Sequence, residues 1–180
     1  RGGRARWPEP LSAGMLHAAG WPNYRMILLP RVTDTGCMSP AKKPFRSEEA
    51  FSRNIGWVTE AEQAALRGKR IAIAGAGGVG GVHLLTLARL GVGAFTIADM
   101  DRFDLVNFNR QAGAMMSTLD RPKVEVMAEM ARDINPELDI RIFPGGVNEA
   151  NLGDFLDGVD VYVDGLDFFA FKARRDTFKA

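Results

Sequence analysis

The sequence predicts an α/β fold with a doubly wound, mainly parallel sheet and flanking helices. Strand-like and helix-like segments alternate over residues 70–164, and a Gly-rich turn joins the first strand to the next helix. The first strand–helix–strand unit occupies about 30 residues, a length that produces parallel strands joined by a right-handed crossover. The final segment, 168–179, resembles a helix cut off at the chain end, so we expect a fold truncated at its C-terminus.

The first regular elements have clear start and stop signals. Thr59 and Glu62 have capping-box spacing, in which each side chain accepts a hydrogen bond from a free amide at the helix start. The helix is expected to run through Arg67 and to end at Gly68. Residues 70–74 then form a short apolar run typical of a buried strand.

The later elements follow the same alternation. Residues 79–90 are apolar nearly all round, as expected of a helix packed against a sheet, and Gly91 is expected to end that helix. Residues 94–98 form the second strand. Beyond them we expect a helix at 122–134, a strand at 139–143, a helix at 148–156 and a strand at 159–164.

Charge and proline content divide the chain near residue 46. The formal net charge of the 180 residues is +1, but residues 1–46 hold eight Lys/Arg and two acids, and the remainder holds 15 and 20. Residues 1–46 are therefore expected to be a basic, Pro-rich leader without regular structure, ahead of a domain at 47–180. Cys37 is the only cysteine, which excludes an intrachain disulfide or a zinc ribbon. The apolar runs fall far short of the roughly 20 residues that span a bilayer, so no membrane is expected.

A glycine motif in the expected turn indicates a nucleotide site. Glycines at the spacing G-x-G-x-x-G follow the first strand and open the next helix: Gly75, Gly77, Gly78 and Gly80. Such glycines let backbone amides approach a phosphate at a helix N-terminus, as in a Rossmann-like fold. Asp99 and Asp101 follow the second strand, where either could bind ribose hydroxyls. The motif alone does not choose between NAD and ATP.

The segment after the second strand favours ATP. Asn107 and Arg110 lie beyond the carboxyl end of that strand, and Lys123 follows Pro122 at the expected start of a helix. Because proline is favoured at the first helical position, Lys123 is expected in the first turn, near free amides. A lysine point charge and an arginine fork suit a polyphosphate, whereas an NAD site has no comparable use for these side chains.

These motifs together resemble the ThiF/MoeB/HesA family of adenylating enzymes, which are related to ubiquitin-activating E1 proteins. The resemblance runs from Phe51 to the chain end. It comprises the Phe51–Ile55 opening with Arg53, the glycine loop, the D-x-D and N-x-x-R-Q stretch, Pro122-Lys123, and an acidic motif at 164–167. Each motif is weak alone, and their order makes the resemblance specific.

The resemblance implies ATP and Mg²⁺ as cofactors and adenylation of a carboxylate with release of pyrophosphate. Asp101 would hold the ribose, and Asn107 and Arg110 the phosphates. Lys123 would neutralise charge on the triphosphate, and Asp167 would bind magnesium. The physical logic agrees, because attack on the α-phosphate needs cations and amides where negative charge develops.

The resemblance also implies partners and a compartment. The substrate would be the C-terminus of a ubiquitin-like or sulfur-carrier protein, in the cytoplasm. Arg53 would reach across a homodimer into the partner's site. Phe168 stands where the family usually has Asn, and Asp120 where it usually has Gly. Because Asp tolerates unusual backbone angles, the replacement of Gly by Asp120 is expected to have little effect on the fold. Asp164, at a strand end, is expected to face solvent.

Three alternatives remain open. One is a tRNA-modifying member that activates the carboxylate of threonylcarbamoyladenosine for cyclisation, because residues 117–127 and 133–136 look like that branch and a basic leader could meet RNA phosphates. The second is an NAD-dependent oxidoreductase, which leaves Asn107, Arg110 and Lys123 without a role. The third is a non-catalytic partner subunit, motivated by Phe168 and by the lack of a cysteine after Asp167.

Overall fold

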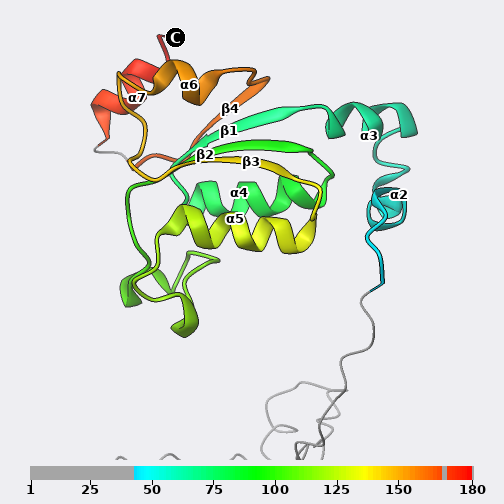
Figure 1. The fold of residues 1–180 in the computed structure, drawn as a ribbon, viewed down its shortest axis with the longest axis horizontal. Coiled ribbons are helices and arrows are strands. Elements are labelled where there is room, and N and C mark those ends of the chain that lie inside the picture. Colours follow the sequence, from blue (N-terminus) through cyan, green and yellow to red (C-terminus); the bar gives the residue numbers. More distant parts are fainter. Residues whose placement is uncertain (1–42, 168–169, 180) are drawn as a thin grey trace, which may run out of the picture. The chain divides into compact units, whose positions relative to one another are not determined.

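Four parallel strands form the centre of the fold (Figure 1). The computed structural model describes residues 43–167 and 170–179. Within them the sheet has the order β3-β2-β1-β4, with strands β1 Arg70–Ala74, β2 Ala94–Ala98, β3 Asp139–Phe143 and β4 Val161–Asp164. Cys37, Phe168 and the expected leader up to residue 42 lie outside the described residues, and the domain boundary near residue 46 stays a prediction.

Helices cover both faces of the sheet, so the doubly wound prediction is confirmed. α4 and α5 lie on one face in Figure 1, and α6 and α7 lie on the other. The helices that precede the sheet come at its amino end. The bounds are α2 Ser47–Ala50, α3 Glu60–Arg67, α4 Gly78–Arg89, α5 Lys123–Ile134, α6 Leu152–Leu156 and α7 Phe171–Thr177, with 3₁₀ turns η1 Ser52–Asn54, η2 Leu105–Asn107 and η3 Met116–Thr118.

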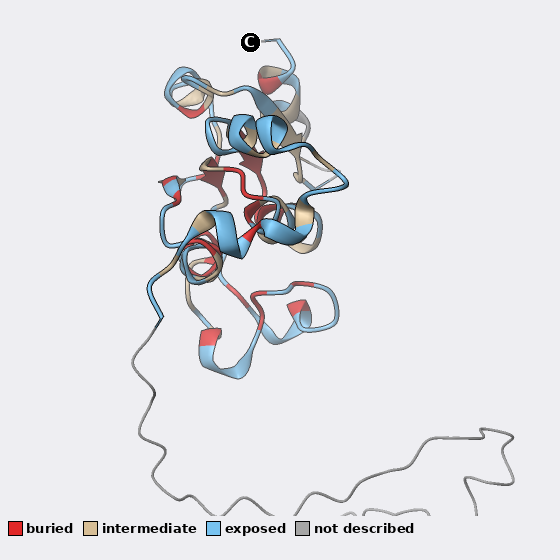
Figure 2. Ribbon diagram, turned by 90° about the vertical axis from the view of Figure 1, so that its right-hand side faces the viewer, coloured by how far each residue is buried: buried red, intermediate tan, exposed pale blue. Residues whose placement is uncertain are grey.

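The strands divide their side chains between the two faces. Ile71 and Ile73 of β1 belong to the larger apolar cluster with α4 and α5, whereas Ala72 and Ala74 belong to the smaller one with Phe155 of α6. This is the period-two alternation that a sheet covered on both faces requires. Figure 2 shows buried residues gathered along the strands and the inner helix faces, while the segment joining β2 to α5 is mostly exposed.

The signals around α3 and α4 behave as the sequence predicts. Glu62 N donates to Thr59 Oγ1 at 3.2 Å, and Thr59 N donates to Glu62 Oε2 at 2.8 Å, so the capping box is formed. The backbone amide and then the hydroxyl of Thr59 hold the pKa of Glu62 below its usual value. Gly91 follows α4 with φ +86°, the left-handed conformation of a helix-ending glycine.

Several element boundaries differ from the prediction by one to four residues, and two of the differences have a clear local cause. α6 begins at Leu152 rather than at 148, because Asn148 Oδ1 accepts hydrogen bonds from the amides of Ala150 and Asn151 and so forms a turn in place of a helix. Pro122, with ψ 130°, precedes α5 instead of occupying its first position, which makes Lys123 the first helical residue. None of the helices in the described ranges is long and apolar enough to cross a membrane.

The packing of α4 on β1 gives a test of the fold. A Cβ on Gly80 would lie 1.8 Å from Gly75 O and 2.9 Å from Ile73 Cγ2, so Gly80→Ala must displace backbone. We expect it to lower the free energy of unfolding by about 3 kcal/mol in urea denaturation. Gly153→Ala in α6, where a Cβ meets nothing within 4 Å, is the control and should cost nothing or stabilise by up to about 1 kcal/mol. Equal stability of the two variants would contradict this packing.

Candidate functional site

A pocket of about 590 Å³ opens at the carboxyl ends of β1, β2 and β4. The chain order reverses between β1 and β4, and ligands of open α/β sheets bind at such a switch point. Of the predicted site residues, nine line this pocket: Gly75, Gly77, Gly78, Asp99, Asp101, Asn107, Arg110, Lys123 and Asp167. Gly80 and Arg53 are not among its lining residues.

The glycine loop lies directly against the turn that follows β4. Gly75 has φ +89°, and a Cβ there would stand 2.3 Å from Gly165 O. α4 begins at Gly78, so the amides of its first turn lack intrahelical acceptors and are free for an anion. Gly80 is buried beneath the loop, where its role is close packing of helix on strand and not contact with a ligand.

Asp99 accepts backbone hydrogen bonds on both of its carboxylate oxygens, one of them from the glycine loop. Oδ2 accepts from Ala76 N at 2.7 Å, and Oδ1 accepts from Asp101 N at 2.8 Å. The carboxylate therefore ties the loop after β1 to the segment after β2. Of the two acids that could bind ribose, Asp99 already has protein donors on both oxygens, so the geometry favours Asp101 for that contact.

Lys123 lies buried at the floor of the pocket with a partner. Its side chain is 7% exposed, and Nζ donates to Asp101 Oδ2 at 2.9 Å, while the Asp101 side chain is 59% exposed. Lys123 N also donates to Asp101 O at 3.0 Å. A buried ammonium needs a counter-charge, and here that charge comes from the acid expected to meet the ribose.

Asn107 and Arg110 come from the η2 segment. Asn107 is buried, and its Oδ1 accepts from Asp104 N at 2.9 Å, which fixes the amide. Arg110 is exposed and donates from Nη1 to Val106 O at 3.1 Å and to Asn109 Oδ1 at 2.9 Å. Both acceptors belong to its own segment, so the guanidinium stands at the pocket without an acidic partner among the described residues.

Asp167 lines the pocket just after the turn that follows β4. Its side chain is exposed and makes no hydrogen bond with any described residue. In the described ranges no group of three or more His, Cys, Asp or Glu could form a protein cage for a metal. A single free carboxylate fits Mg²⁺, which is bound mostly by waters and substrate phosphates with one or two carboxylates.

Two features of this region were not predicted. Asp164 does not face solvent, because Arg174 of α7 donates from Nε to its Oδ2 at 2.6 Å; the expectation was wrong since it ignored the next helix. Gln111 is buried beside the glycine loop, and its Oε1 has no partner among the described residues. Asp120 has φ +61°, so the tolerance expected of Asp at this position is confirmed.

Arg53 lies away from this pocket. It belongs to η1 and is exposed, and no described acid pairs with it. Its predicted role therefore depends on a second copy of the chain.

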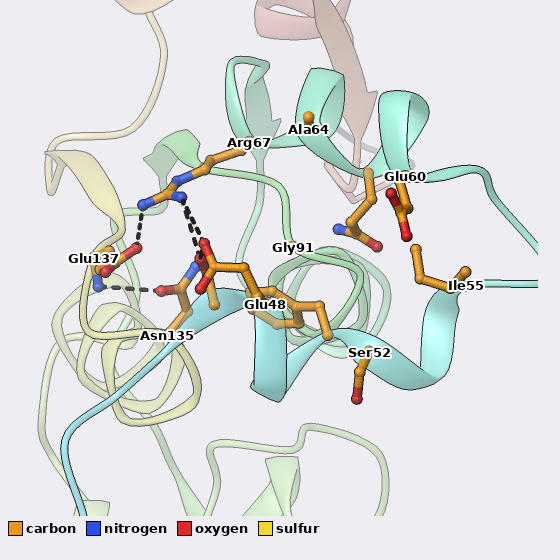
Figure 3. A pocket seen from close by; sticks show the side chains of 13 residues that line it. Glu48, Ser52, Ile55, Glu60, Ala64, Arg67, Gly91, Asn135 and Glu137 are labelled. Carbon is orange, nitrogen blue, oxygen red and sulfur yellow. Dashed lines mark hydrogen bonds and ion pairs between the residues drawn. The ribbon is translucent and has the colours of Figure 1, made fainter.

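A second pocket, of about 660 Å³, lies near the amino ends of the strands (Figure 3). None of the predicted site residues lines it. Arg67 reaches across it to Glu137 Oε2 at 2.7 Å, and Glu137 N donates to Asn135 Oδ1 at 3.1 Å. These internal contacts, at the end of a parallel sheet where ligands rarely bind, favour a packing role for this pocket.

The ordered set of phosphate-compatible side chains in the first pocket agrees with a family match over most of the chain. The sequence model of the ThiF family matches residues 51–179. The chain belongs to the ThiF family.

Relatives of this ThiF-family chain include a tRNA threonylcarbamoyladenosine dehydratase of Bacillus subtilis (strain 168), 36% identical over 123 residues, which are 68% of this chain and 48% of that protein. A SAMP-activating enzyme E1 of Haloferax volcanii is 32% identical over 107 residues, 59% of this chain and 40% of that protein. The E. coli tRNA N6-threonylcarbamoyladenosine dehydratase in complex with ATP matches with TM-score 0.68 and 30% identity over 72% of this chain and 53% of that chain. This chain spans about half the length of these relatives.

The ion pair in the pocket of this ThiF-family chain can be tested by a double-mutant cycle. Asp101→Asn should lower the free energy of unfolding by about 1 kcal/mol, because it leaves the buried Lys123 ammonium without a counter-charge. Lys123→Met should cost less, and Asp101→Asn should have no further effect in that background. Urea denaturation of the four proteins measures the coupling; purely additive effects would contradict the pairing.

Proposed function

We propose that this chain binds ATP and transfers its AMP moiety to a carboxylate, releasing pyrophosphate. The observation that carries the proposal is the single pocket that collects the glycine loop, Asn107, Arg110, Lys123 and Asp167. Adenylation needs positive charge and amide donors at the phosphates and almost no acid–base chemistry. An NAD-dependent oxidoreductase would leave the cations of this pocket without a role, and the family match supports adenylation.

Each residue has a task in that reaction. The first-turn amides of α4 and the Lys123 ammonium bind phosphate oxygens, and Arg110, whose side chain lies beside Gly78 at the start of α4, adds a guanidinium. Asp101, released from Lys123, accepts from a ribose hydroxyl. Asp167 would hold Mg²⁺, which would supply charge neutralisation at the phosphates. When the carboxylate oxygen bonds to the α-phosphorus, the bond from that phosphorus to the bridging oxygen breaks and pyrophosphate leaves.

As the carboxylate we propose that of threonylcarbamoyladenosine in tRNA, in place of the protein C-terminus favoured by the motifs alone. Three relatives are tRNA threonylcarbamoyladenosine dehydratases, at 36%, 40% and 38% identity. The resemblance of residues 117–127 and 133–136 to that branch supports the same choice. A carrier-protein C-terminus is the second candidate, supported by the SAMP-activating E1 and by the MoeZ adenylyltransferase/sulfurtransferase of Mycobacterium tuberculosis at 33% identity.

Exchange of labelled pyrophosphate into ATP tests this function. We expect exchange with tRNA that carries threonylcarbamoyladenosine and none with tRNA that lacks it. Lys123→Ala should reduce exchange at least about 100-fold, because it removes a charge from the transition state. Lys69→Ala, an exposed lysine paired with Asp160, should leave it unchanged. Exchange only with a Gly-Gly carrier protein would select the second substrate, and tight NAD binding without exchange would refute adenylation.

A homodimer in which Arg53 completes the partner's site is part of the proposal. Arg53 stands outside its own pocket and is flanked by exposed apolar side chains, Ile55 and Trp57, the latter 94% exposed. The η2 and η3 segments beside the pocket expose Leu105, Val106 and Met116. Exposed large apolar side chains are typical of a protein–protein interface, and here they support an interface with a second copy of this chain.

Mixing two inactive variants tests the shared site. In a dimer of Arg53→Ala with Lys123→Ala, one site keeps Lys123 and receives Arg53 from the other protomer. A refolded equimolar mixture should therefore recover about one quarter of the wild-type exchange rate, since half of the dimers are mixed and each has one intact site. Recovery of no activity in mixed dimers, shown to form by mass spectrometry, would contradict an arginine supplied by the partner.

A further inference from the structure

Arg174 of α7 bridges the two ends of the turn that follows β4. Its Nε donates to Asp164 Oδ2 at 2.6 Å, and its Nη2 donates to Leu166 O at 2.7 Å. The other oxygen of Asp164 accepts from Leu166 N at 3.1 Å. One guanidinium and one carboxylate thus close the turn on itself.

The opposite side of this turn is fixed by the glycine loop. Gly165 N donates to Ala74 O at 2.8 Å, and any Cβ on Gly165 would lie 2.9 Å from Gly75 O. The turn is therefore held between β1 with its glycine loop and the Arg174 side chain. Asp167 comes next in the chain, and because its carboxylate has no hydrogen bond to a described residue, the turn backbone sets its position.

The ion pair of Arg174 is less exposed than that of the adjacent Arg175. The side chains of Arg174 and Asp164 are 28% and 22% exposed, so their pair is partly desolvated, and the planar fork serves two acceptors at once. Arg175 is 62% exposed and, among the described residues, pairs only with the adjacent Asp176, at 3.3 Å. Ala173 of the same helix and Ala170, which precedes it, line the candidate nucleotide pocket, so Arg174 ties this wall of the pocket to the turn.

We infer that Arg174 is a positioning residue that presents the Asp167 carboxylate to the divalent cation bound with the triphosphate. The inference rests on the proposed function, in which Asp167 holds Mg²⁺. Without the guanidinium, the Leu166 carbonyl and Asp164 Oδ2 lose their donor, and the turn and α7 separate. The position of the Asp167 carboxylate is then no longer fixed, while the positions of the glycine loop and of Lys123 are unchanged.

Binding measurements on the full chain separate these effects. Mn²⁺ affinity in the presence of ATP, followed by electron paramagnetic resonance, reports the metal site, and ATP affinity in EDTA reports the rest of the pocket. Arg174→Gln should weaken Mn²⁺ binding about tenfold, as loss of an outer partner of a metal ligand does. Metal-free ATP affinity should change less than twofold. Arg174→Lys, with one donor group in place of a fork, should give an intermediate Mn²⁺ affinity.

The controls keep the inference separate from the proposed function. Arg175→Gln removes the same charge one residue away and should bind Mn²⁺ and ATP like the wild type. Wild-type Mn²⁺ affinity in Arg174→Gln, or an equal loss of metal-free ATP binding, would overturn the positioning role. Should Arg174→Gln fail to fold by circular dichroism, Arg174→Lys and Asp164→Asn decide by the same criteria. If Asp167→Asn binds Mn²⁺ normally, the proposed metal role of Asp167 is what fails.

Discussion

The site depends on one close approach of backbone to backbone, between the loop after β1 and the turn after β4. Gly75 and Gly165 face one another so closely that a Cβ on Gly75 would lie 2.3 Å from Gly165 O. No side chain fits between these segments, so two loops about 90 residues apart in sequence form one continuous wall. That contact brings the free first-turn amides of α4 and the Asp167 carboxylate to the same pocket.

Two of the charged groups in the pocket, Lys123 and Asp99, already have partners within the protein. The buried Lys123 ammonium pairs with Asp101. Both carboxylate oxygens of Asp99 accept hydrogen bonds from backbone amides, one in the loop after β1 and one in the segment after β2. Under the proposed function, nucleotide binding breaks the contact between Lys123 and Asp101. Lys123 then contacts a phosphate, and Asp101 contacts the ribose. The exchange keeps the buried ammonium paired throughout, which lowers the cost of opening the site.

Most of the fold followed from sequence, because β1 and β2 are short, mainly apolar runs followed by Gly75 and Asp99, and β3 alternates polar and apolar residues. The pocket was also predictable, since its residues follow strand ends in a known motif order. What the sequence did not indicate depends mainly on contacts between separate segments of the chain, and the Asn148 turn is a local exception. The Asn148 side chain replaced a turn of helix, Asp99 meets an amide of a different loop, and Arg174 reaches Asp164 from the next helix. Gln111 belongs to the N-x-x-R-Q motif, but the sequence did not indicate that its side chain is buried beside the glycine loop.

The central claim is that the pocket at the carboxyl ends of β1, β2 and β4 binds the triphosphate of ATP. A crystal structure of the full chain with Mg²⁺ and a non-hydrolysable ATP analogue tests it most directly. The account predicts phosphate oxygens on the first-turn amides of α4 and on Lys123 Nζ, with Asp101 turned to the ribose and the metal beside Asp167. Nucleotide bound in the pocket near Arg67 and Glu137, or phosphates that leave Lys123 paired with Asp101, would contradict it.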